Sequence, residues 1–505
     1  MTERSRIGLT ILGVAGLFGI LGDALLRSTP WGLNLLLWMI PFAVALLLCL
    51  PVRPTALKGG GGWLLALLLT LTAGLIWRDS PVLKALSVLA VMIALALLLV
   101  RAQGGQVRTA GVVEYLAGGA VTGLNAVAGA LHLMLSDFPW SALFNRQTAR
   151  RPLALARGLA LALPLLLLFG GLLVAGDPIF AAIVQRVLFP DFSVVLTITT
   201  HCAVIGAVTW MVAGYLRGLL VGDERARLLR LAVPAPCLGS TEVSTVFGLL
   251  DVLFLLFVLV QARYLFGGAS LVGIKPGLTY AEYARQGFFE LVAVAALALP
   301  ILLGAHWLLR KEEEAGERRF RLLALVQVLL LFVIMASAID RMLLYECEYG
   351  QTELRLYTSA FMGWLGLVFL WFLPTVLRGR RRYFMFGAML AGFAVLGSLY
   401  VVNPDATIAR VNVARAAAGQ GFDSSYAASL SADAIPVLVA GLPSLNPRDR
   451  SSLARDLLQK WPAAGSGDWR VWSLSRREAQ RWVSKYRPLL TSLAGEGASQ
   501  GLSLR

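Results

Sequence analysis

Long uncharged apolar runs recur along the chain from Leu9 to Val402, and short segments that hold most of the charge separate them. Each run is roughly 17 to 25 residues long, which lets a helix cross a hydrocarbon core about 30 Å thick. Inside a bilayer the backbone must satisfy its own hydrogen bonds, so uninterrupted runs of this kind fold as helices. The pattern predicts eleven spans, at about 7–26, 32–50, 62–77, 82–100, 153–176, 193–216, 243–266, 285–309, 320–345, 354–377 and 383–402.

The predicted fold class is therefore all-α, a polytopic transmembrane helix bundle with a small helical extracytoplasmic C-terminal domain. The chain is 58% hydrophobic and 15% charged, whereas soluble domains carry roughly 25% charged residues. Its richness in leucine and alanine excludes a transmembrane barrel, which shows short alternating segments. The first 26 residues resemble a secretory signal, but Asp23 and Arg27 interrupt the cleavage site, so we expect a retained first helix.

Lysine and arginine are distributed unevenly between the two sides of the predicted bundle. With the N-terminus in the cytoplasm, the cytoplasmic segments carry 23 of the 45 basic residues, and the outer loops carry only Arg27, Arg78, Lys84, Arg186 and Lys275. This bias is what the positive-inside rule requires. We therefore expect a cytoplasmic N-terminus, an extracytoplasmic C-terminus and no nucleic-acid partner, despite the net charge of +16.

The segment 111–145 does not fit a single crossing. Four spans precede Arg101, and the span at 153–176 must also begin in the cytoplasm, so an interfacial or re-entrant segment is expected; a tight double crossing is the alternative. The expected plan is transmembrane helices at 1–110, the interfacial or re-entrant segment at 111–152, the main bundle at 153–402, a helical domain at 403–490 and a disordered tail at 491–505.

Composition changes at Asn403-Pro404, beyond which polar residues dominate. Helices are predicted at 404–418, 447–460 and 475–487. Four tryptophans lie near a basic cluster made of Arg476, Arg477, Arg481, Lys485 and Arg487. Tryptophan favours interfaces and basic side chains attract anionic lipids. We expect this domain to rest on the outer membrane face, with the lipid bilayer and its anionic headgroups as partners.

Several motifs carry a family resemblance. They are Arg157-Gly158, Ala162–Leu165, Asp177–Phe180, Leu278–Phe288, Arg341 with Tyr345, Tyr349–Tyr357, Asn403–Asp405, Ile408–Asn412, Leu430–Ala434 and Asp468–Arg470. In combination they resemble the bacterial membrane-protein family called domain of unknown function 4173, which is related to family 4153. The resemblance covers about 150–490. It implies a multi-pass protein of a bacterial membrane, here expected to be the cytoplasmic (inner) membrane, and it implies no particular activity.

Ionisable residues inside spans mark candidate sites, because each costs about 2–3 kcal/mol at a helix centre unless it has a partner or a cavity. Asp251 lies nearest the middle of the membrane. We predict that a second group approaches at the outer leaflet and lines an outward-facing polar cavity: Glu282, Arg285, Glu290, Asp340, Arg341, Tyr345 and Arg355. The alternative is an ordinary interfacial belt with interhelical ion pairs.

No cofactor or metal is expected. The four cysteines show no C-x-x-C spacing, and the three histidines are isolated. The run Gly59–Gly62 is not followed by the lysine and hydroxyl residue of a phosphate loop. Any protein partner in the membrane stays unidentified.

Two classes of function follow. The first is a non-enzymatic bundle, transporter-like or sensory and regulatory, with an outward-facing polar site. The second is a membrane enzyme that acts on a lipid-linked substrate at the outer leaflet. One class of such enzymes, the polyprenyl-phosphate glycosyltransferases, usually carries acidic residues in a long first outer loop, yet that loop is only about Ser28–Trp31. The non-enzymatic hypothesis is therefore preferred.

Overall fold

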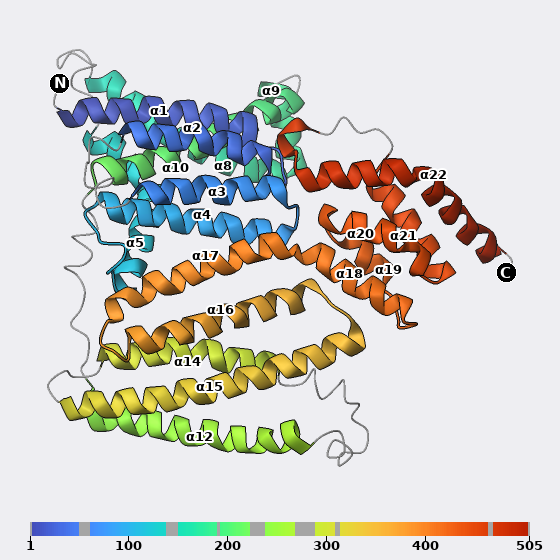
Figure 1. The fold of residues 1–505 in the computed structure, drawn as a ribbon. Coiled ribbons are helices and arrows are strands. Elements are labelled where there is room, and N and C mark those ends of the chain that lie inside the picture. The colour runs from blue at the N-terminus through green and yellow to red at the C-terminus, as the bar shows by residue number, and fades with distance from the viewer. Residues whose placement is uncertain are drawn as a thin grey trace.

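The computed structural model describes residues 3–49, 61–137, 150–188, 192–222, 238–267, 288–308, 314–462 and 468–502. Helices make up nearly all of these residues, and no β-strand occurs among them (Figure 1). The predicted fold class, an all-α polytopic bundle with a small helical C-terminal domain, is confirmed.

Each of the eleven predicted spans coincides with an apolar helix. Eight of these helices are long and apolar enough to cross a membrane, while α2, α3 and the apolar part of α8 are shorter. The helices are α1 (Glu3–Leu26), α2 (Leu33–Cys49), α3 (Gly62–Trp77), α4 (Pro81–Ala102), α8 (Arg150–Gly176), α10 (Phe192–Leu220), α12 (Ser240–Gly267), α14 (Phe288–Leu308), α15 (Glu314–Tyr349), α16 (Glu353–Thr375) and α17 (Phe384–Val402).

Residues 112–137 form a further continuous helical segment, built from α5 (Val112–Leu124), η3 (Asn125–Gly129), α6 (Ala130–His132) and η4 (Leu133–Asp137). It is long and apolar enough to cross a membrane. Yet it starts beside the end of α4, and its last residue, Asp137, pairs with Arg217 in the last turn of α10 at 2.9 Å. Both places lie at the end of the bundle away from the C-terminal domain (Figure 1). An interfacial segment has this geometry, and its location at the membrane surface stays a prediction.

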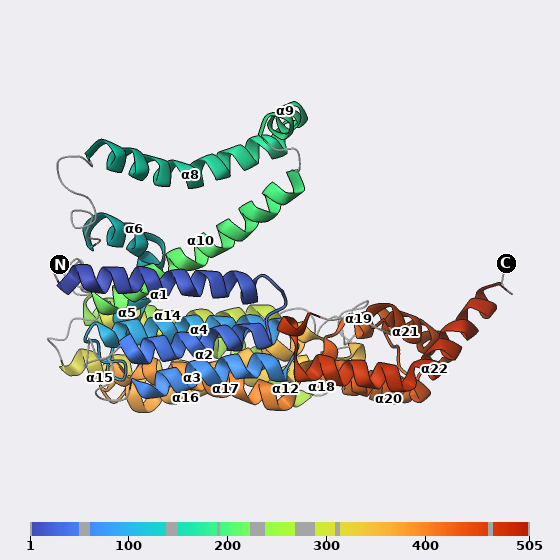
Figure 2. The same ribbon diagram turned by 90° about the horizontal axis from the view of Figure 1, so that it is seen from above.

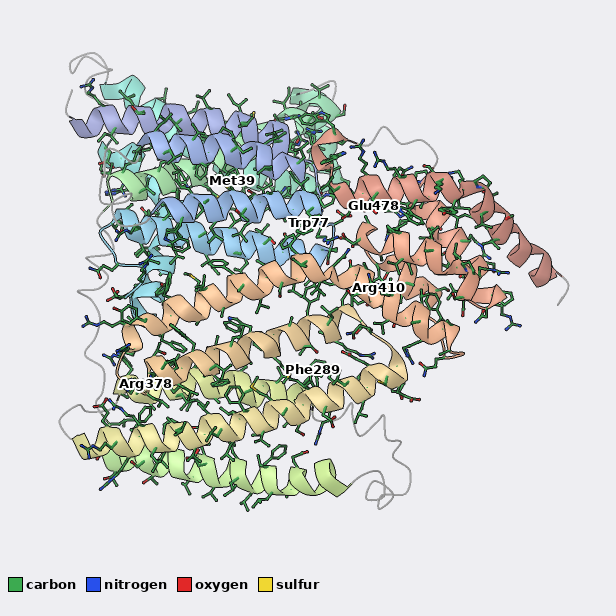
Figure 3. The ribbon with its side chains drawn as sticks, in the orientation of Figure 1. Met39, Trp77, Phe289, Arg378, Arg410 and Glu478 are labelled. Atoms are coloured by element: carbon green, nitrogen blue, oxygen red, sulfur yellow. The ribbon has the colours of Figure 1, made fainter. Side chains whose placement is uncertain are left out.

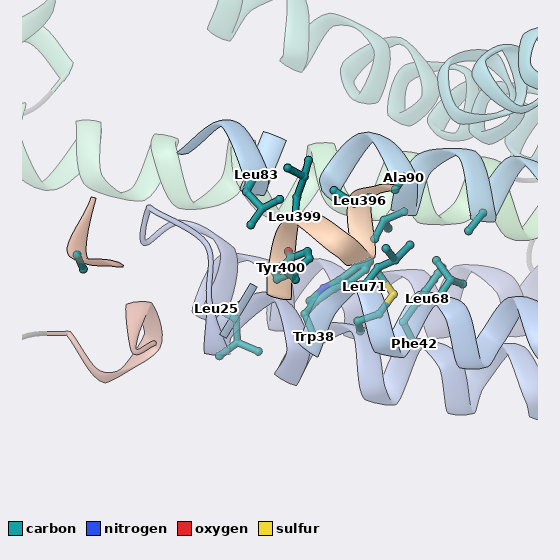
Figure 4. Close-up of a cluster of buried hydrophobic side chains, with 14 of the residues drawn as sticks. Leu25, Trp38, Phe42, Leu68, Leu71, Leu83, Ala90, Leu396, Leu399 and Tyr400 are labelled. Carbon is teal, nitrogen blue, oxygen red and sulfur yellow. The ribbon is translucent and has the colours of Figure 1, made fainter. Parts of the chain in front are cut away.

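Buried side chains form two clusters within the bundle. The first cluster contains residues of helices α1, α2, α3, α4 and α10 and of the C-terminal domain. Its aromatic centre is formed by Phe18, Trp38 and Phe42, whose ring centroids lie 5.0 to 5.5 Å apart (Figure 4 labels Trp38 and Phe42). The second joins α12, α14, α15 and α16. Helix α17 connects them, because Phe384 packs in the second cluster and Tyr400 in the first. Helices α8 and α9 (Pro178–Leu188) contribute described side chains to neither cluster, and Figure 2 shows them to one side.

The C-terminal domain extends beyond the bundle from the end of α17 (Figures 1 and 2). Two of its helices begin where proline follows an asparagine cap. The Asn403 side chain accepts from the amide of Ala406 at 3.4 Å, and that of Asn446 accepts from the amide of Asp449 at 2.9 Å. Its helices are α18 (Pro404–Ala417), α19 (Ser424–Ser429), α20 (Ile435–Gly441), α21 (Pro447–Lys460) and α22 (Leu474–Leu502). Its short turns of 3-10 helix are η7 (Ala432–Ala434), η8 (Leu442–Ser444) and η9 (Trp469–Val471), whereas η6 (Arg381–Tyr383) precedes α17 in the bundle.

The last described helix extends past residue 491. A disordered tail is predicted from residue 491, and that boundary stays a prediction. The helix α22 runs to Leu502, and Leu493 is buried, so packing continues at least two residues beyond 491.

Helices α10 and η3 approach each other closely through glycines. A Cβ added to Gly214 would lie 2.0 Å from the backbone oxygen of Asn125, and one added to Gly129 would lie 2.9 Å from the Cα of Gly214. Two helices can approach this closely only where both lack side chains. The glycines therefore fix the position of the 112–137 segment against α10.

We expect Gly214→Ala to destabilise the protein by about 1–3 kcal/mol, the usual effect of inserting a methyl group into a packed contact. Thermal unfolding of the purified protein in detergent measures the effect. The matched control is Gly206→Ala on the same helix, where an added Cβ meets no atom within 4 Å. Equal melting temperatures for the two variants would contradict the close packing.

Candidate functional site at the junction of the bundle and the C-terminal domain

The short connection between α3 and α4 carries charged residues into the junction. Arg78 is extended, with φ −115° and ψ 151°, and so ends α3. Pro81 starts α4, because its fixed φ suits the first helical position and its missing N–H is not needed there. Asp79 stands between them, and Lys84 follows in the first turn of α4. Asp79 and Lys84 are both buried.

Asp79 bridges the bundle and the C-terminal domain. Its carboxylate accepts from the Nζ of Lys84 at 2.6 Å. It also accepts from the Nε of Arg476, on α22, at 3.0 Å and 2.9 Å to its two oxygens. One carboxylate therefore holds a cation from α4 and a cation from the domain, and charge-assisted bonds of this kind are stronger than neutral ones.

Asp433 forms the reciprocal contact from the domain side, in η7. Its carboxylate accepts from the backbone amide of Asp79 at 2.7 Å and from the hydroxyl of Ser475 at 2.6 Å. The hydroxyl of Ser431 lies 3.3 Å from the same carboxylate, and the guanidinium of Arg78 lies 3.5 Å away. A carboxylate with this many donors is well compensated for its burial.

These groups form what we call the junction latch: Arg78, Asp79, Lys84, Asp433, Ser475 and Arg476. The latch contains two carboxylates and three cations, so it is nearly neutral overall. Removing one member of a buried ion pair costs about 3–5 kcal/mol, since its partner is left charged and uncompensated. The domain is thereby fixed to the α3–α4 connection.

Hydroxyl groups extend the contacts of α4 to two neighbouring helices. Ser80 is 3.0 Å from the phenol oxygen of Tyr357 on α16, and Ser87 is 2.7 Å from that of Tyr400 on α17. Arg78 also donates to the backbone oxygen of Tyr400 at 2.9 Å. A displacement of Arg78 would therefore change contacts of α17 as well as contacts within the latch.

A second set of contacts docks the domain on the α1–α2 connection. Arg470 donates to the backbone oxygen of Ala24 at 2.8 Å. The backbone amide of Leu33 donates to the backbone oxygen of Trp472 at 3.1 Å. The domain thus holds two inter-helix connections at the same end of the bundle.

Asp405, in the first turn of α18, is fully buried, and only one of its carboxylate oxygens has a partner among the described residues. That oxygen accepts from the amide of Ser431 at 3.2 Å. Burial raises the pKa of the Asp405 carboxyl to about 6, and the nearby negative charges of Glu353 and Asp433 act in the same direction, against the hydrogen bonds from Ser431. The carboxyl is therefore poised to change its charge between mildly acidic and neutral pH.

A groove of about 430 Å³ opens beside the latch. It is half polar in its lining, and three of the lining side chains are arginines. Figure 3 labels two of the lining residues, Trp77 from the bundle and Glu478 from the domain. The lining residues are Trp77, Arg78, Leu474, Ser475, Arg477, Glu478, Arg481 and Trp482.

Comparison with known proteins gives one result. Residues 62–441 match the family described as Domain of unknown function (DUF4153). The chain belongs to the DUF4153 family. No curated protein and no solved structure matches the chain.

The DUF4153 match runs from α3 to α20, so it contains Asp79 and Asp433 but ends before Ser475 and Arg476 on α22. The resemblance to the related family 4173, expected from the motifs, stays a prediction. The match brings no assigned activity to either half of the junction.

Two of the predicted outer-leaflet residues come together in this DUF4153 protein. The guanidinium of Arg355 lies over the ring of Tyr345, 4.0 Å from its centroid, and donates to the backbone oxygen of Gly350. Both side chains line a small groove of about 170 Å³, together with Phe288 and Phe289 at the start of α14. The groove is mostly apolar, and its contacts are those of a cation–π pair.

The remaining members of the predicted cluster lie in different surroundings. Asp340 and Glu290 are exposed, whereas Arg341 is buried. Consecutive helical residues point about 100° apart, which places Asp340 and Arg341 in different surroundings on α15. A shared cavity for the predicted cluster stays a prediction. Glu282 and Arg285 lie outside the described residues.

The junction residues were not selected as a site from the sequence. Lys84 was counted as an outer-loop charge, and Arg476 was assigned to the cluster expected to meet headgroups. Asp405 and Asp433 appeared only within the family motifs. The available signal was a lysine one turn into an apolar run, next to an aspartate, because such a charge needs a buried partner.

We expect acidification to strengthen the packing around Asp405. A carboxyl whose pKa is higher in the folded state than in the unfolded chain contributes stability below its unfolded pKa, 3.8, and loses it as the pH rises through about 6. Lowering the pH from 7 to 5 should stabilise the region of α18 by about 1 kcal/mol. Hydrogen exchange of the α18 amides as a function of pH measures this change.

Asp405→Asn keeps the shape and removes the titration, so its α18 protection should not vary over that pH range. Asp456→Asn, on α21, is the matched control and should keep the wild-type dependence. An Asp405→Asn profile that still follows wild type would show that another group titrates.

Proposed function

We propose that this protein is a non-enzymatic sensor of the bacterial cytoplasmic membrane. Its C-terminal domain, on the extracytoplasmic side, binds a phosphate-bearing group in the junction groove. Occupancy is relayed through the junction latch to α3 and α4. The anionic headgroup of a lipid and a free phosphate share this chemistry.

The observation that carries the proposal is that Arg78 takes part in two sets of contacts. It lines the groove, and it also pairs with Asp433 and donates to the backbone of Tyr400. An anion that attracts the Arg78 guanidinium must compete with these two partners. Binding in the groove is therefore coupled to contacts that hold the domain and α17.

The composition of the groove supports an anionic ligand. Arg477 and Arg481 are exposed and one turn apart on α22, and Glu478 is the acidic lining residue. The Arg78 guanidinium lies 4.6 Å from the ring centroid of Trp77. Arginine binds phosphate oxygens through two parallel hydrogen bonds, and tryptophan favours the membrane interface. Each basic residue near an anionic surface contributes about 1 kcal/mol.

The proposed orientation rests on the positions of the arginines. Arg101, Arg217 and Arg321 lie at the helix ends away from the domain, as does the cluster Arg378–Arg382 (Figure 3 labels Arg378). Under the positive-inside rule that end faces the cytoplasm. The C-terminal domain then faces outward.

Reporter fusions test this orientation. A phosphatase that is active only outside the cytoplasm should be active when fused after Val402 and inactive when fused after Arg382. The reverse pattern would place the domain in the cytoplasm and exclude an outer-leaflet ligand.

Titration calorimetry on the full chain in detergent tests the ligand. Inorganic phosphate and short-chain phosphatidylglycerol are the two probes, and short-chain phosphatidylcholine is the neutral lipid comparison. We expect the Arg477→Ala, Arg481→Ala double variant to bind at least about tenfold more weakly, since each charge-assisted bond contributes about 1.5 kcal/mol or more. The charge-matched control, Arg448→Ala with Arg455→Ala on α21, should bind as wild type does.

The relay has its own readout, which is hydrogen exchange in the α3–α4 connection with and without phosphatidylglycerol. Wild type should change its exchange there on binding. Asp433→Asn should bind the lipid, but its exchange in the α3–α4 connection should not change on binding.

Two outcomes of the calorimetry would change the proposal. Binding of inorganic phosphate alone would assign a soluble ligand, and binding by the Arg477→Ala, Arg481→Ala variant equal to that of wild type would refute the groove as the site.

A further inference from the structure

Helices α12 and α15 pack side by side and run in the same direction. The rings of Phe247 and Phe320 contact each other at 5.6 Å, and further along both helices the hydroxyl of Ser337 donates to the side-chain oxygen of Gln261 at 3.2 Å. Because the second contact lies later in the sequence of both helices, the two helices run parallel. This seam belongs to the second buried cluster, away from the junction latch.

The register places two polar side chains at one depth. Asp251 precedes Gln261 by ten residues, and Gln327 precedes Ser337 by ten residues. Because both helices rise equally per residue, the Gln261–Ser337 contact sets Asp251 level with Gln327. The Phe247–Phe320 contact sets it three residues, about 4.5 Å, short of Gln327, so the two side chains lie close to one level of the seam. Asp251 lies one turn after Phe247, and so it stands between the ring contact and the Gln261 hydrogen bond.

Both side chains are buried and lack partners among the described residues. Gln327 is 0% exposed and Asp251 is 7% exposed. Both carboxyl oxygens of Asp251, and both the amide oxygen and nitrogen of Gln327, make no hydrogen bond there. Buried polar groups are nearly always paired in proteins, so four such atoms at one level indicate a site that takes a ligand.

The chemistry of the pair favours a proton over a metal cation. Two carboxyl oxygens and one amide oxygen are available, whereas calcium takes about 6–8 oxygen ligands and magnesium requires an octahedron. The flanking side chains on the seam, Phe247 and Phe254, supply no oxygen. A proton needs only one acceptor, and it removes the charge that is costly to hold inside a bilayer.

Other charged groups lie toward the helix ends. On α15, Arg321 lies six residues before Gln327, about 9 Å along the helix, and Asp340 and Arg341 lie 13 and 14 residues beyond it, about 20 Å along the helix. The Arg321 guanidinium pairs with Glu317 at 2.6 Å. On α14, the ring of His306 packs on that of Phe320 at 5.2 Å. On α12 itself, Glu242 lies at the helix start.

We propose that Asp251, with Gln327 opposite it, is a proton-binding site inside the membrane. The Asp251 carboxylate takes a proton from the aqueous side, and the new O–H donates to the amide oxygen of Gln327. The amide nitrogen of Gln327 then donates to the second carboxyl oxygen. This site is independent of the proposed function at the junction groove.

Infrared difference spectroscopy of the full chain in liposomes, between acidic and alkaline pH, tests the site. A protonated carboxyl gives a C=O stretching band that disappears on ionisation. We expect Asp251→Asn to lack one such band, and Gln327→Leu to retain it at a higher frequency because the hydrogen bond is lost. Asp340→Asn, an exposed aspartate on α15, is the matched control and should keep the wild-type band.

An Asp251→Asn spectrum identical to that of wild type would overturn the proposal. So would a Gln327→Leu band at the wild-type frequency, which decides the matter alone if Asp251→Asn does not fold. Loss of the band on adding sodium at constant acidic pH would also overturn it, because the carboxylate would then hold a cation. Phosphatidylglycerol binding by these variants should equal that of wild type, which separates this test from that of the groove.

Discussion

The carboxylate of Asp433 is the contact through which the C-terminal domain and the membrane helices become one structure. It accepts hydrogen bonds from the amide of Asp79 in the α3–α4 connection and from Ser475 on α22. Asp79 lies 354 residues before Asp433, and Ser475 lies 42 residues after it, so ordering these segments together costs entropy that strong bonds must offset. Their mutual burial makes those bonds strong, because a low-dielectric junction strengthens hydrogen bonds to charged groups.

This arrangement divides the bundle into two parts with different roles. The first buried cluster continues from α1–α4 into α18–α22, so the groove, the latch and Asp405 share one packed unit. The second cluster joins α12 and α15, the helices that carry Asp251 and Gln327. Helix α17 packs in both clusters, through Phe384 at one end and Tyr400 at the other. A change at either site can reach the other only through such shared helices, which is the physical requirement for coupling.

Local pattern predicted the helices, and tertiary contacts account for what it did not predict. Apolar run lengths predicted the eleven apolar helices, and the predicted helices at 404–418 and 447–460 begin where α18 and α21 begin. The latch was not predictable in this way, because Asp79 meets Arg476 across 397 positions and nothing in either neighbourhood specifies the other. The outer-leaflet cluster was predicted by depth alone. Tyr345 and Arg355, which were predicted at the same depth, are in contact. Depth alone does not predict that Asp340 is exposed while Arg341 is buried.

Among the described residues, buried carboxyl groups differ in how many hydrogen-bond donors surround them, and this difference indicates where function lies. Asp433 is surrounded by donors, as a structural carboxylate should be. Asp405 and Asp251 each keep at least one oxygen without a partner among the described residues. An asparagine at 405 could accept the same bond from the Ser431 amide without a charge, so packing alone does not require the acid. Features that cost stability without serving the fold are expected at functional sites. Asp405 and Asp251, whose carboxyl groups lack hydrogen-bond partners at one or both oxygens, are therefore the places where a change of protonation would alter this structure most.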